Sequence, residues 1–168
     1  MKFKALCLSF LVLASAPAFA DNVVGGSIKA SPGSDTVLVS GLKVQKVTGK
    51  PGQETLVATD SVKPGEVLQY SLTYQNKSTS SLKKVEFVLP IPKETEYTPT
   101  AGMSALELAS LDGQTFETVP LKRKVKTAEG KEVAQDVPPV EYRFLKWTKA
   151  EMPAGDKLTF HARVTAKK

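Results

Sequence analysis

One segment of the chain combines a tight turn with a strand of strict alternation: Pro64-Gly65-Glu66-Val67-Leu68-Gln69-Tyr70-Ser71-Leu72-Thr73-Tyr74. Proline and glycine favour the turn, because proline fixes φ and glycine adopts positive φ without strain. After the turn, every second residue from Leu68 to Tyr74 is apolar. Successive side chains of a strand point to opposite faces, so this pattern predicts one face on a core and the other in water.

A second segment repeats the pattern further along the chain. Pro153-Ala154-Gly155-Asp156 leads into a strand whose alternate positions are Leu158, Phe160, Ala162 and Val164. The two segments look like an internal repeat. We interpret them instead as two different strands of one sandwich, which line a common core and mark where the domain starts and stops.

The residues between and around these segments indicate further short strands with turn signals roughly every dozen residues. We expect strands over 36–47, 55–62, 82–89, 95–100, 116–125 and 140–147, and a hairpin at Asp112-Gly113. Residues 104–110 are the one plausible helical turn, although Leu106 and Leu108 also fit a strand. Short strands without alternating long helices predict an all-β fold, with an immunoglobulin-like β-sandwich as its form.

The largest apolar side chains of these strands form the predicted core. The parity of apolar residues slips between Phe144 and Leu145, which indicates a bulge or a strand covered on both faces. Trp147 is expected to be the largest core residue rather than a surface platform for a ligand. The predicted core residues are Tyr70, Leu72, Tyr74, Phe87, Phe144, Trp147 and Phe160.

The first 20 residues have the pattern of a signal peptide. Lys2 and Lys4 precede a short apolar run, and Ala18-Phe19-Ala20 supplies the small residues of a cleavage site. We expect cleavage after Ala20, a flexible lead-in over 21–35, and a single β-sandwich domain over 36–168. The only cysteine, Cys7, lies inside the apolar run, so the mature chain is expected to lack disulfides and thiolate sites.

Export without disulfides fits a bacterial envelope, either the periplasm or the cell surface. Removal of 20 residues from 168 leaves 148, the size of one domain. Lys2 and Lys4 leave with the signal, so 21 basic residues remain against 17 acidic ones, a net charge of +4. This mild charge allows attraction to anionic envelope polymers without requiring nucleic acid, and we expect no transmembrane segment in the mature chain.

No constellation of side chains points to catalysis, to a metal or to a cofactor. His161, the only histidine, is expected to face away from the core, and one histidine without a cysteine does not make a zinc site. The sequence has no Gly-X-Ser-X-Gly elbow, no Asp-X-Asp-X-Asp-Gly calcium loop and no phosphate-binding glycine loop. We therefore expect a protein that is not an enzyme, although calcium bound by inter-strand turns stays open.

The densest basic run is Lys122-Arg123-Lys124-Val125-Lys126. In a strand, the three lysines would share one face, with Val125 opposite. One interpretation is a solvated edge strand whose lysines block pairing with another chain. The other is a patch for anions of the envelope, made by Lys122, Arg123, Lys124 and Lys126.

Four segments, in order, resemble a repeat module of bacterial and archaeal surface proteins, named only as domain of unknown function number eleven. They are residues 62–76 with the turn residue Asn76, residues 85–92, residues 95–97, and residues 145–160 with the turn 153–156. The resemblance implies an immunoglobulin-like sandwich in extracytoplasmic proteins, often used as a spacer or adhesive stalk. This chain has one copy, and residues 123–139 look like an insertion into the module.

These observations predict an exported module with a structural or binding role in the bacterial cell envelope. Its partners would be envelope proteins or anionic envelope polymers, contacted through sheet edges or loops. The alternative is a periplasmic assembly factor or chaperone for surface structures. That role needs an exposed edge strand with alternating apolar residues, for which residues 36–47 are the candidate.

Replacing Trp147 with alanine tests the predicted core. We expect Trp147→Ala to lower the free energy of unfolding by roughly 3–5 kcal/mol, because a large buried side chain is lost and a cavity remains. Urea unfolding of the two proteins measures the difference. A melting temperature that does not move would place Trp147 at the surface.

Overall fold

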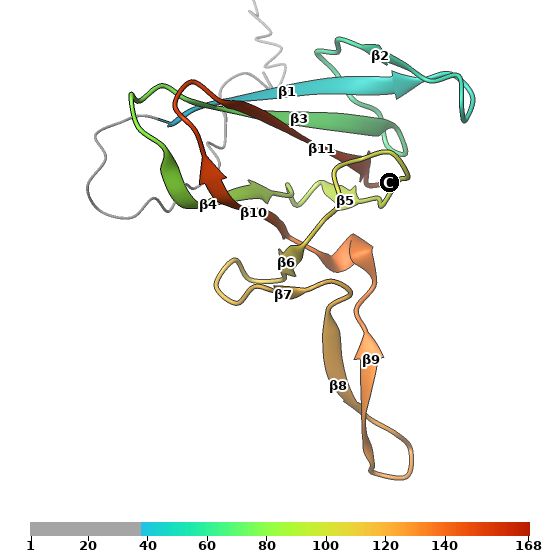
Figure 1. Ribbon diagram of the computed structural model, residues 1–168. Helices are drawn as coiled ribbons and strands as arrows, with labels where there is room; N and C mark the ends of the chain where they lie inside the picture. The colour runs from blue at the N-terminus through green and yellow to red at the C-terminus, as the bar shows by residue number, and fades with distance from the viewer. Residues whose placement is uncertain (1–37) are drawn as a thin grey trace, which may run out of the picture.

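The computed structural model describes residues 38–168, which form eleven strands and one short helix in two packed antiparallel sheets and a projecting hairpin (Figure 1). The expected signal peptide, the lead-in and the first two residues of the expected domain lie outside the described residues. The all-β sandwich that the sequence predicts is confirmed.

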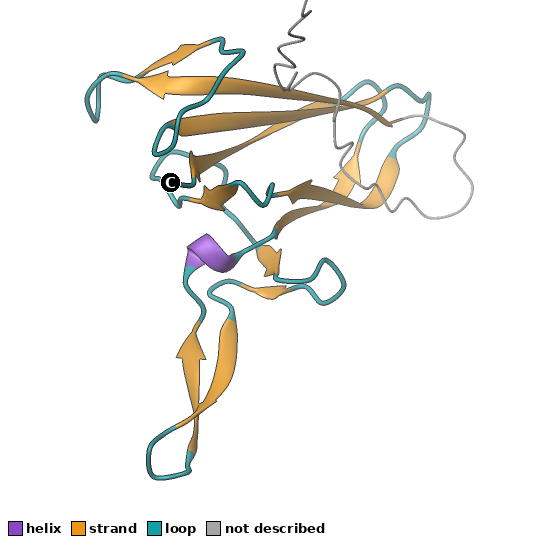
Figure 2. Cartoon of the chain, turned by 180° about the vertical axis from the view of Figure 1, so that it is seen from behind, coloured by secondary structure: helices purple, strands orange, loops and turns teal. Residues whose placement is uncertain are grey.

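The larger sheet has the strand order β2-β1-β3-β11-β5. Its members are β1 (Leu38–Thr48), β2 (Thr55–Val57), β3 (Val67–Asn76), β11 (Lys157–Ala166) and β5 (Thr95–Tyr97). The smaller sheet has the order β4-β10-β6-β7, formed by β4 (Leu82–Pro90), β10 (Phe144–Met152), β6 (Leu108–Ser110) and β7 (Glu117–Thr118). A two-stranded sheet of β8 (Lys122–Lys126) and β9 (Glu132–Asp136) projects away from both (Figure 2).

The core lies between the two sheets and is centred on aromatic contacts. The ring of Phe87 on β4 lies 4.6 Å from Tyr74 on β3, measured between centroids. Trp147 on β10 stacks at 5.0 Å on Phe160 of β11. Of the predicted core residues, the structure buries Tyr70, Leu72, Tyr74, Phe87 and Trp147, and it half-buries Phe160 against them.

The two similar segments are neighbours, because β3 and β11 pair along their whole length in the middle of the larger sheet. The turn before each strand also holds the end of the other strand. The Gly65 amide donates to the Ala166 carbonyl at 2.9 Å, and the Gly155 amide donates to the Asn76 carbonyl at 2.9 Å. Both glycines have positive φ, 83° and 76°. The repeated pattern is therefore one strand pair with related turns at its two ends.

Asn76, fully buried at the end of β3, connects two turns through its side chain. Its Nδ2 donates to the carbonyls of Ser80, Met152 and Pro153 at 2.9–3.0 Å. Its Oδ1 accepts from the backbone amide and hydroxyl of Ser78. One side chain thus fixes the β3–β4 turn against the β10–β11 turn.

Phe144 is not a core residue, which corrects the prediction. It is half-buried and points to the outer face of the smaller sheet, while its neighbour Leu145 is fully buried. The loop that follows β6 covers Phe144, since Phe116 makes an edge contact with its ring at 6.5 Å and Gly113 lies against it. A β-carbon on Gly113 would lie 2.8 Å from that ring. The strand is thus covered on both faces here, as one of the two predicted alternatives had it.

The break in alternation lies elsewhere, at the far end of the β4–β10 pair. Lys84 has a positive φ of 53°, and the paired register skips it. Buried residues on β4 run through Val85 and Phe87, whereas on β10 Trp147 is followed by Met152, five residues later. Trp147 and Met152 are an odd number of positions apart, so in a regular strand they would face opposite sides. The local twist at Lys84 allows both side chains to face the core.

Three predicted elements differ in detail. Residues 104–110 contain no helical turn, and the strand alternative holds at their end, where β6 lies. The short 3-10 helix η1 (Pro139–Glu141) occupies the start of the expected strand over 140–147. Pro138 precedes this turn and Pro139 begins it, and the Tyr142 amide donates to the Pro139 carbonyl at 3.0 Å. The strand expected over 55–62 ends at Val57, and the residues after it form a loop.

Alanine at Asn76 tests the loop connection. We expect Asn76→Ala to lower the free energy of unfolding by about 3 kcal/mol, because an unmet buried hydrogen-bonding group costs about 1–3 kcal/mol and several lose their partner. Gln75→Ala, one residue away with its side chain half-exposed, is the control and should change stability by about 0.5 kcal/mol or less. Equal losses in the two variants would contradict the role of Asn76.

Candidate functional site

The most unusual surface is one edge of strand β1. Its residues 38–46 pair with β3 on one side. On the other side, β2 pairs only with residues 46–48. Within residues 38–168, the segment 38–45 therefore has no partner strand on that side, which leaves a row of backbone donors and acceptors about 25 Å long. We call residues 38–45 the open edge.

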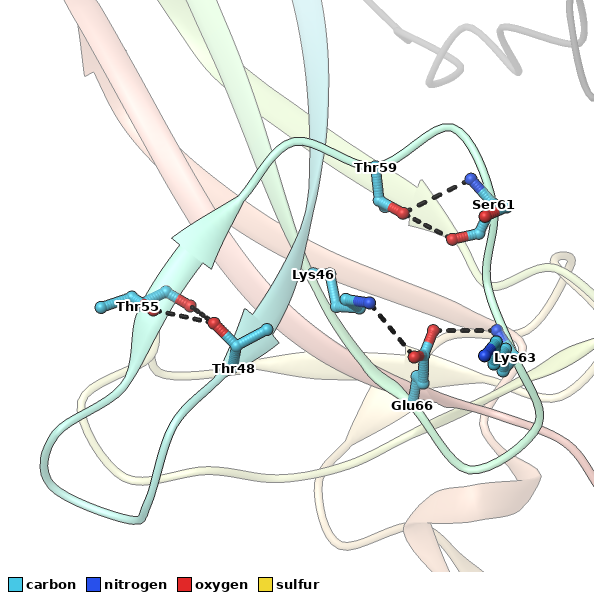
Figure 3. Close-up of polar contacts among 7 residues, drawn as sticks. All are labelled: Lys46, Thr48, Thr55, Thr59, Ser61, Lys63 and Glu66. Carbon is cyan, nitrogen blue, oxygen red and sulfur yellow. Dashed lines mark hydrogen bonds and ion pairs between the residues drawn. The ribbon is translucent and has the colours of Figure 1, made fainter.

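The end of the open edge is defined by polar contacts around β2 (Figure 3). Thr48 and Thr55 join their hydroxyls at 2.8 Å across the β1–β2 pair. Lys46 forms an ion pair with Glu66 at 3.2 Å. Glu66 also accepts from the Lys63 amide at 2.8 Å, so it ties the loop before β3 to β1. Lys46 is the residue of β1 that lies opposite the end of β2, so these contacts mark where the open edge ends.

The same partners, Lys63 and Lys46, stabilise the ionised form of Glu66. Hydrogen bonds from the Lys63 backbone amide and from the Lys46 ammonium group lower the pKa of the Glu66 carboxyl below its ordinary value. The ionised form is therefore favoured in the folded protein, and the loop stays fixed beside the open edge at neutral pH.

Apolar side chains lie near the open edge on the core-facing side of β1. Leu38 and Leu42 are half-buried and pack against the core. Val44, on the same face, keeps 38% of its surface exposed, and Val57 of β2 keeps 46%. A strand added beside β1 would thus meet apolar contacts on one face as well as free backbone groups.

A second free edge lies on the same side of the sandwich. The ring contact between Tyr74 and Phe87 shows that β3 lies opposite β4. The contact between Phe160 and Trp147 shows in the same way that β11 lies opposite β10. Because β1 lies beyond β3 and the free edge of β4 lies beyond β10, both edges face the same way. The β4 edge is less suited to pairing, since it carries Lys83, the twisted Lys84 and Pro90.

The predicted basic patch is divided between two faces of the projecting hairpin. Lys122, Lys124 and Lys126 share a face, but they are paired in register with Asp136, Ala134 and Glu132. Lys124 also lies 3.8 Å from Glu132. Arg123 points the other way and binds Glu141 through two contacts of 2.8 and 3.2 Å. The four residues do not form one anion-binding surface, which favours the interpretation of a charged, protected edge.

The hairpin is anchored only at its base. Leu121 and Val137 are buried there, joined by a 2.8 Å backbone hydrogen bond, and the Leu121 amide donates to the Tyr142 hydroxyl. Beyond the base, every strand residue is exposed except the half-buried Val125. Residues 123–139, which the resemblance predicts to be an insertion, thus form an arm with charged edges.

Within residues 38–168, His161 belongs to no group of side chains that could bind a metal ion. It lies on the outer face of the larger sheet, where its Nδ1 makes a 3.0 Å hydrogen bond with the Ser71 hydroxyl. Among the described residues, no group of three or more histidine, cysteine, aspartate or glutamate side chains is placed to bind a metal ion.

Comparisons with protein-family models, with characterised proteins and with solved structures find no match to this chain. The resemblance to domain of unknown function number eleven accordingly stays a prediction. No helix within residues 38–168 is long and apolar enough to cross a membrane.

The sequence names residues 36–47 as the candidate for an exposed edge strand with alternating apolar residues, and within residues 38–168 the structure places β1 at such an edge. The extent of the open edge could not be predicted, because it depends on where β2 ends and on the order of strands in the sheet. The one available signal is the weak protection of the segment, which has a single lysine, Lys43, and no proline over residues 38–45.

Glutamine at Glu66 tests the contacts that end the open edge. Because the folded pKa of Glu66 is lowered, its contribution to stability is present above the ordinary value of 4.5 and is lost as the pH falls below it. Glu66→Gln should therefore be less stable than the natural protein at pH 7, with the difference shrinking in acid. Urea unfolding across this pH range measures it.

Glu117→Gln is the matched control, because Glu117 is exposed on β7 and makes no side-chain hydrogen bond within the described residues. A difference between natural protein and Glu66→Gln that stays constant from pH 7 into acid would contradict the assignment.

Proposed function

We propose that this protein is an exported, non-enzymatic module of the bacterial cell envelope, with an immunoglobulin-like sandwich that binds its partner by strand addition at the open edge. Strand addition uses free backbone donors and acceptors for affinity, and alternate side chains for selectivity. The observation that carries the proposal is the unpaired segment 38–45 of β1.

The contrast between the edges supports this choice. An exposed strand edge invites pairing with other chains, and proteins usually block it with charge, proline or distortion. The hairpin edge has Lys122, Arg123, Lys124 and Lys126, and the β4 edge has two lysines and a proline. The open edge is longer than the hairpin strands and has only Lys43. The open edge lacks the protection that these two edges have, so it is suited to binding another strand.

Export and envelope location rest on the signal-peptide pattern of residues 1–20 and on the absence of cysteine from the rest of the sequence. The mild positive charge adds attraction to anionic envelope material. The resemblance to a surface-protein module supports the same compartment and an immunoglobulin-like topology.

A second function, that of a periplasmic assembly factor or chaperone, is favoured by the same edge. Leu38, Leu42 and Val44 give the core-facing side of β1 the apolar character that a client strand needs, although Ser40 interrupts it. Co-purification distinguishes the two functions. A stable envelope partner indicates the structural role, and transient subunits of surface structures indicate the assembly factor.

Blocking the open edge tests the proposed function. Ser40→Lys combined with Val44→Lys places two charges on the core-facing side of the edge, a device that natural edge strands use against pairing. Both positions are exposed, so the fold should persist. We expect this variant to lose most of its retention on purified envelopes of the cells that make it, measured by co-sedimentation.

The hairpin provides the control. Changing Lys122, Arg123, Lys124 and Lys126 to glutamine should leave most of the retention in place, because the positive charge is only a secondary attraction, provided that both variants melt near the natural protein. Retention that survives the edge variant but falls in the hairpin variant would overturn the proposal and restore the anion-binding interpretation.

A further inference from the structure

We propose that the partner at the open edge is a second copy of this chain, which pairs through its own β1 in antiparallel orientation about a two-fold axis at Gly41. The inference rests on the proposed function, since it names the partner of the same edge. The two larger sheets would become one continuous sheet across the dimer.

The register follows from where the edge begins and ends. A two-fold axis between antiparallel strands puts one residue opposite its own copy. With Gly41 at the axis, residues 38–44 pair with residues 44–38 of the other copy, and the pairing stops before Lys46, where β2 already occupies the edge. This register pairs seven residues and keeps every described residue of the other copy clear of β2.

The neighbouring registers are less favourable. An axis at Leu42 also pairs seven residues, 39–45, but it brings Leu38 of the other copy opposite Lys46, where β2 already lies. An axis at Lys43 sets two lysines directly opposite each other, which is destabilising. An axis at Ser40 shortens the pairing to residues 38–42. Clearance from β2, electrostatics and strand length together therefore select Gly41.

The selected register also matches side chains on the core-facing side. It sets Leu38 opposite Val44 of the other copy, and Ser40 opposite Leu42. Val44, which is 38% exposed in one copy, would gain an apolar neighbour. Apolar cross-strand pairs are a main source of stability in sheets. No two charges of like sign stand opposite each other.

Gly41 accepts a side chain in the free protein. A β-carbon built on Gly41 has no other atom within 4 Å, and its φ lies outside the positive region that disfavours side chains. Substitutions at Gly41 should therefore change the edge without disturbing the fold. Their effect on dimer formation can thus be measured without a change in the stability of the single chain.

Charge substitutions at the axis give the main test. In the full chain, Gly41→Lys and Gly41→Glu each set like charges opposite each other in the dimer, whereas a mixture of the two proteins sets opposite charges. We expect sedimentation equilibrium to give a dimer for the natural protein and for Gly41→Ala, monomers for each charged variant, and a dimer for the equimolar mixture. Two charged variants that stay dimeric would overturn the proposal, as would a mixture that stays monomeric.

A disulfide tests the register directly. Residues directly opposite in antiparallel strands have α-carbons about 4.5–5.5 Å apart, inside the range of about 4.4–6.8 Å that a disulfide spans. In a Cys7→Ser background, Gly41→Cys should form a covalent dimer under mild oxidation, and Lys43→Cys should not. Rapid cross-linking of Lys43→Cys with none at Gly41→Cys would overturn the register.

The two proposals fail separately. If the natural protein is monomeric and Gly41→Cys does not cross-link, the second copy is not the partner. Loss of envelope retention in the Ser40→Lys and Val44→Lys variant would then still support strand addition, with another protein or residues outside 38–168 at the edge. If the dimer forms but the edge variant keeps its retention, the proposed function fails and the dimer stands.

Discussion

The pairing of β3 with β11 is the contact on which the rest of the sandwich depends. These strands come from segments about half the chain apart, and each is held at its end by the turn that precedes the other. The pair presents Tyr74 and Phe160 to the opposite sheet, where Phe87 and Trp147 pack against them. Long-range antiparallel pairing costs loop-closure entropy, so the two glycine turns and the buried Asn76 matter because they fix both ends of the pair at once.

With β3 and β11 in the centre, the outer positions of the larger sheet are left to β1 and β5. The free side of β11 is occupied along much of its length. β5 pairs with β11, the Thr98 amide donates to the Arg163 carbonyl, and the Ser104 hydroxyl accepts from the His161 amide. The β1 side receives only the three residues of β2 within the described part of the chain. The open edge is thus a consequence of the strand order. The difference between the well-covered β11 side and the uncovered β1 side supports the proposal that the open edge is a binding surface.

Strand alternation was enough to predict the sandwich and most of its core, because burial on one face imposes a period of two that residues 68–74 show clearly. It failed at Phe144, where two adjacent apolar residues left the inward parity undecided and the loop with Gly113 covers the outer face. The pairing between the two similar segments was also missed, since strand order depends on contacts between residues far apart in sequence. The basic run was placed correctly in a strand, but its ion pairs with Glu132 and Glu141 could not be predicted before the hairpin register was known.

The energetics of the open edge favour a contact that depends on concentration. A hydrogen bond gained on pairing adds only about 0.5–1.5 kcal/mol net, because the free edge is already hydrated. Association costs an estimated 4–15 kcal/mol in lost motion. Backbone pairing over residues 38–44 would therefore offset much of that cost with little left over, so the apolar contacts of Leu38, Leu42 and Val44 decide whether the complex is stable. In the envelope location that we propose, the module would meet its partner at high local concentration, where a weak edge contact is sufficient for assembly and remains reversible.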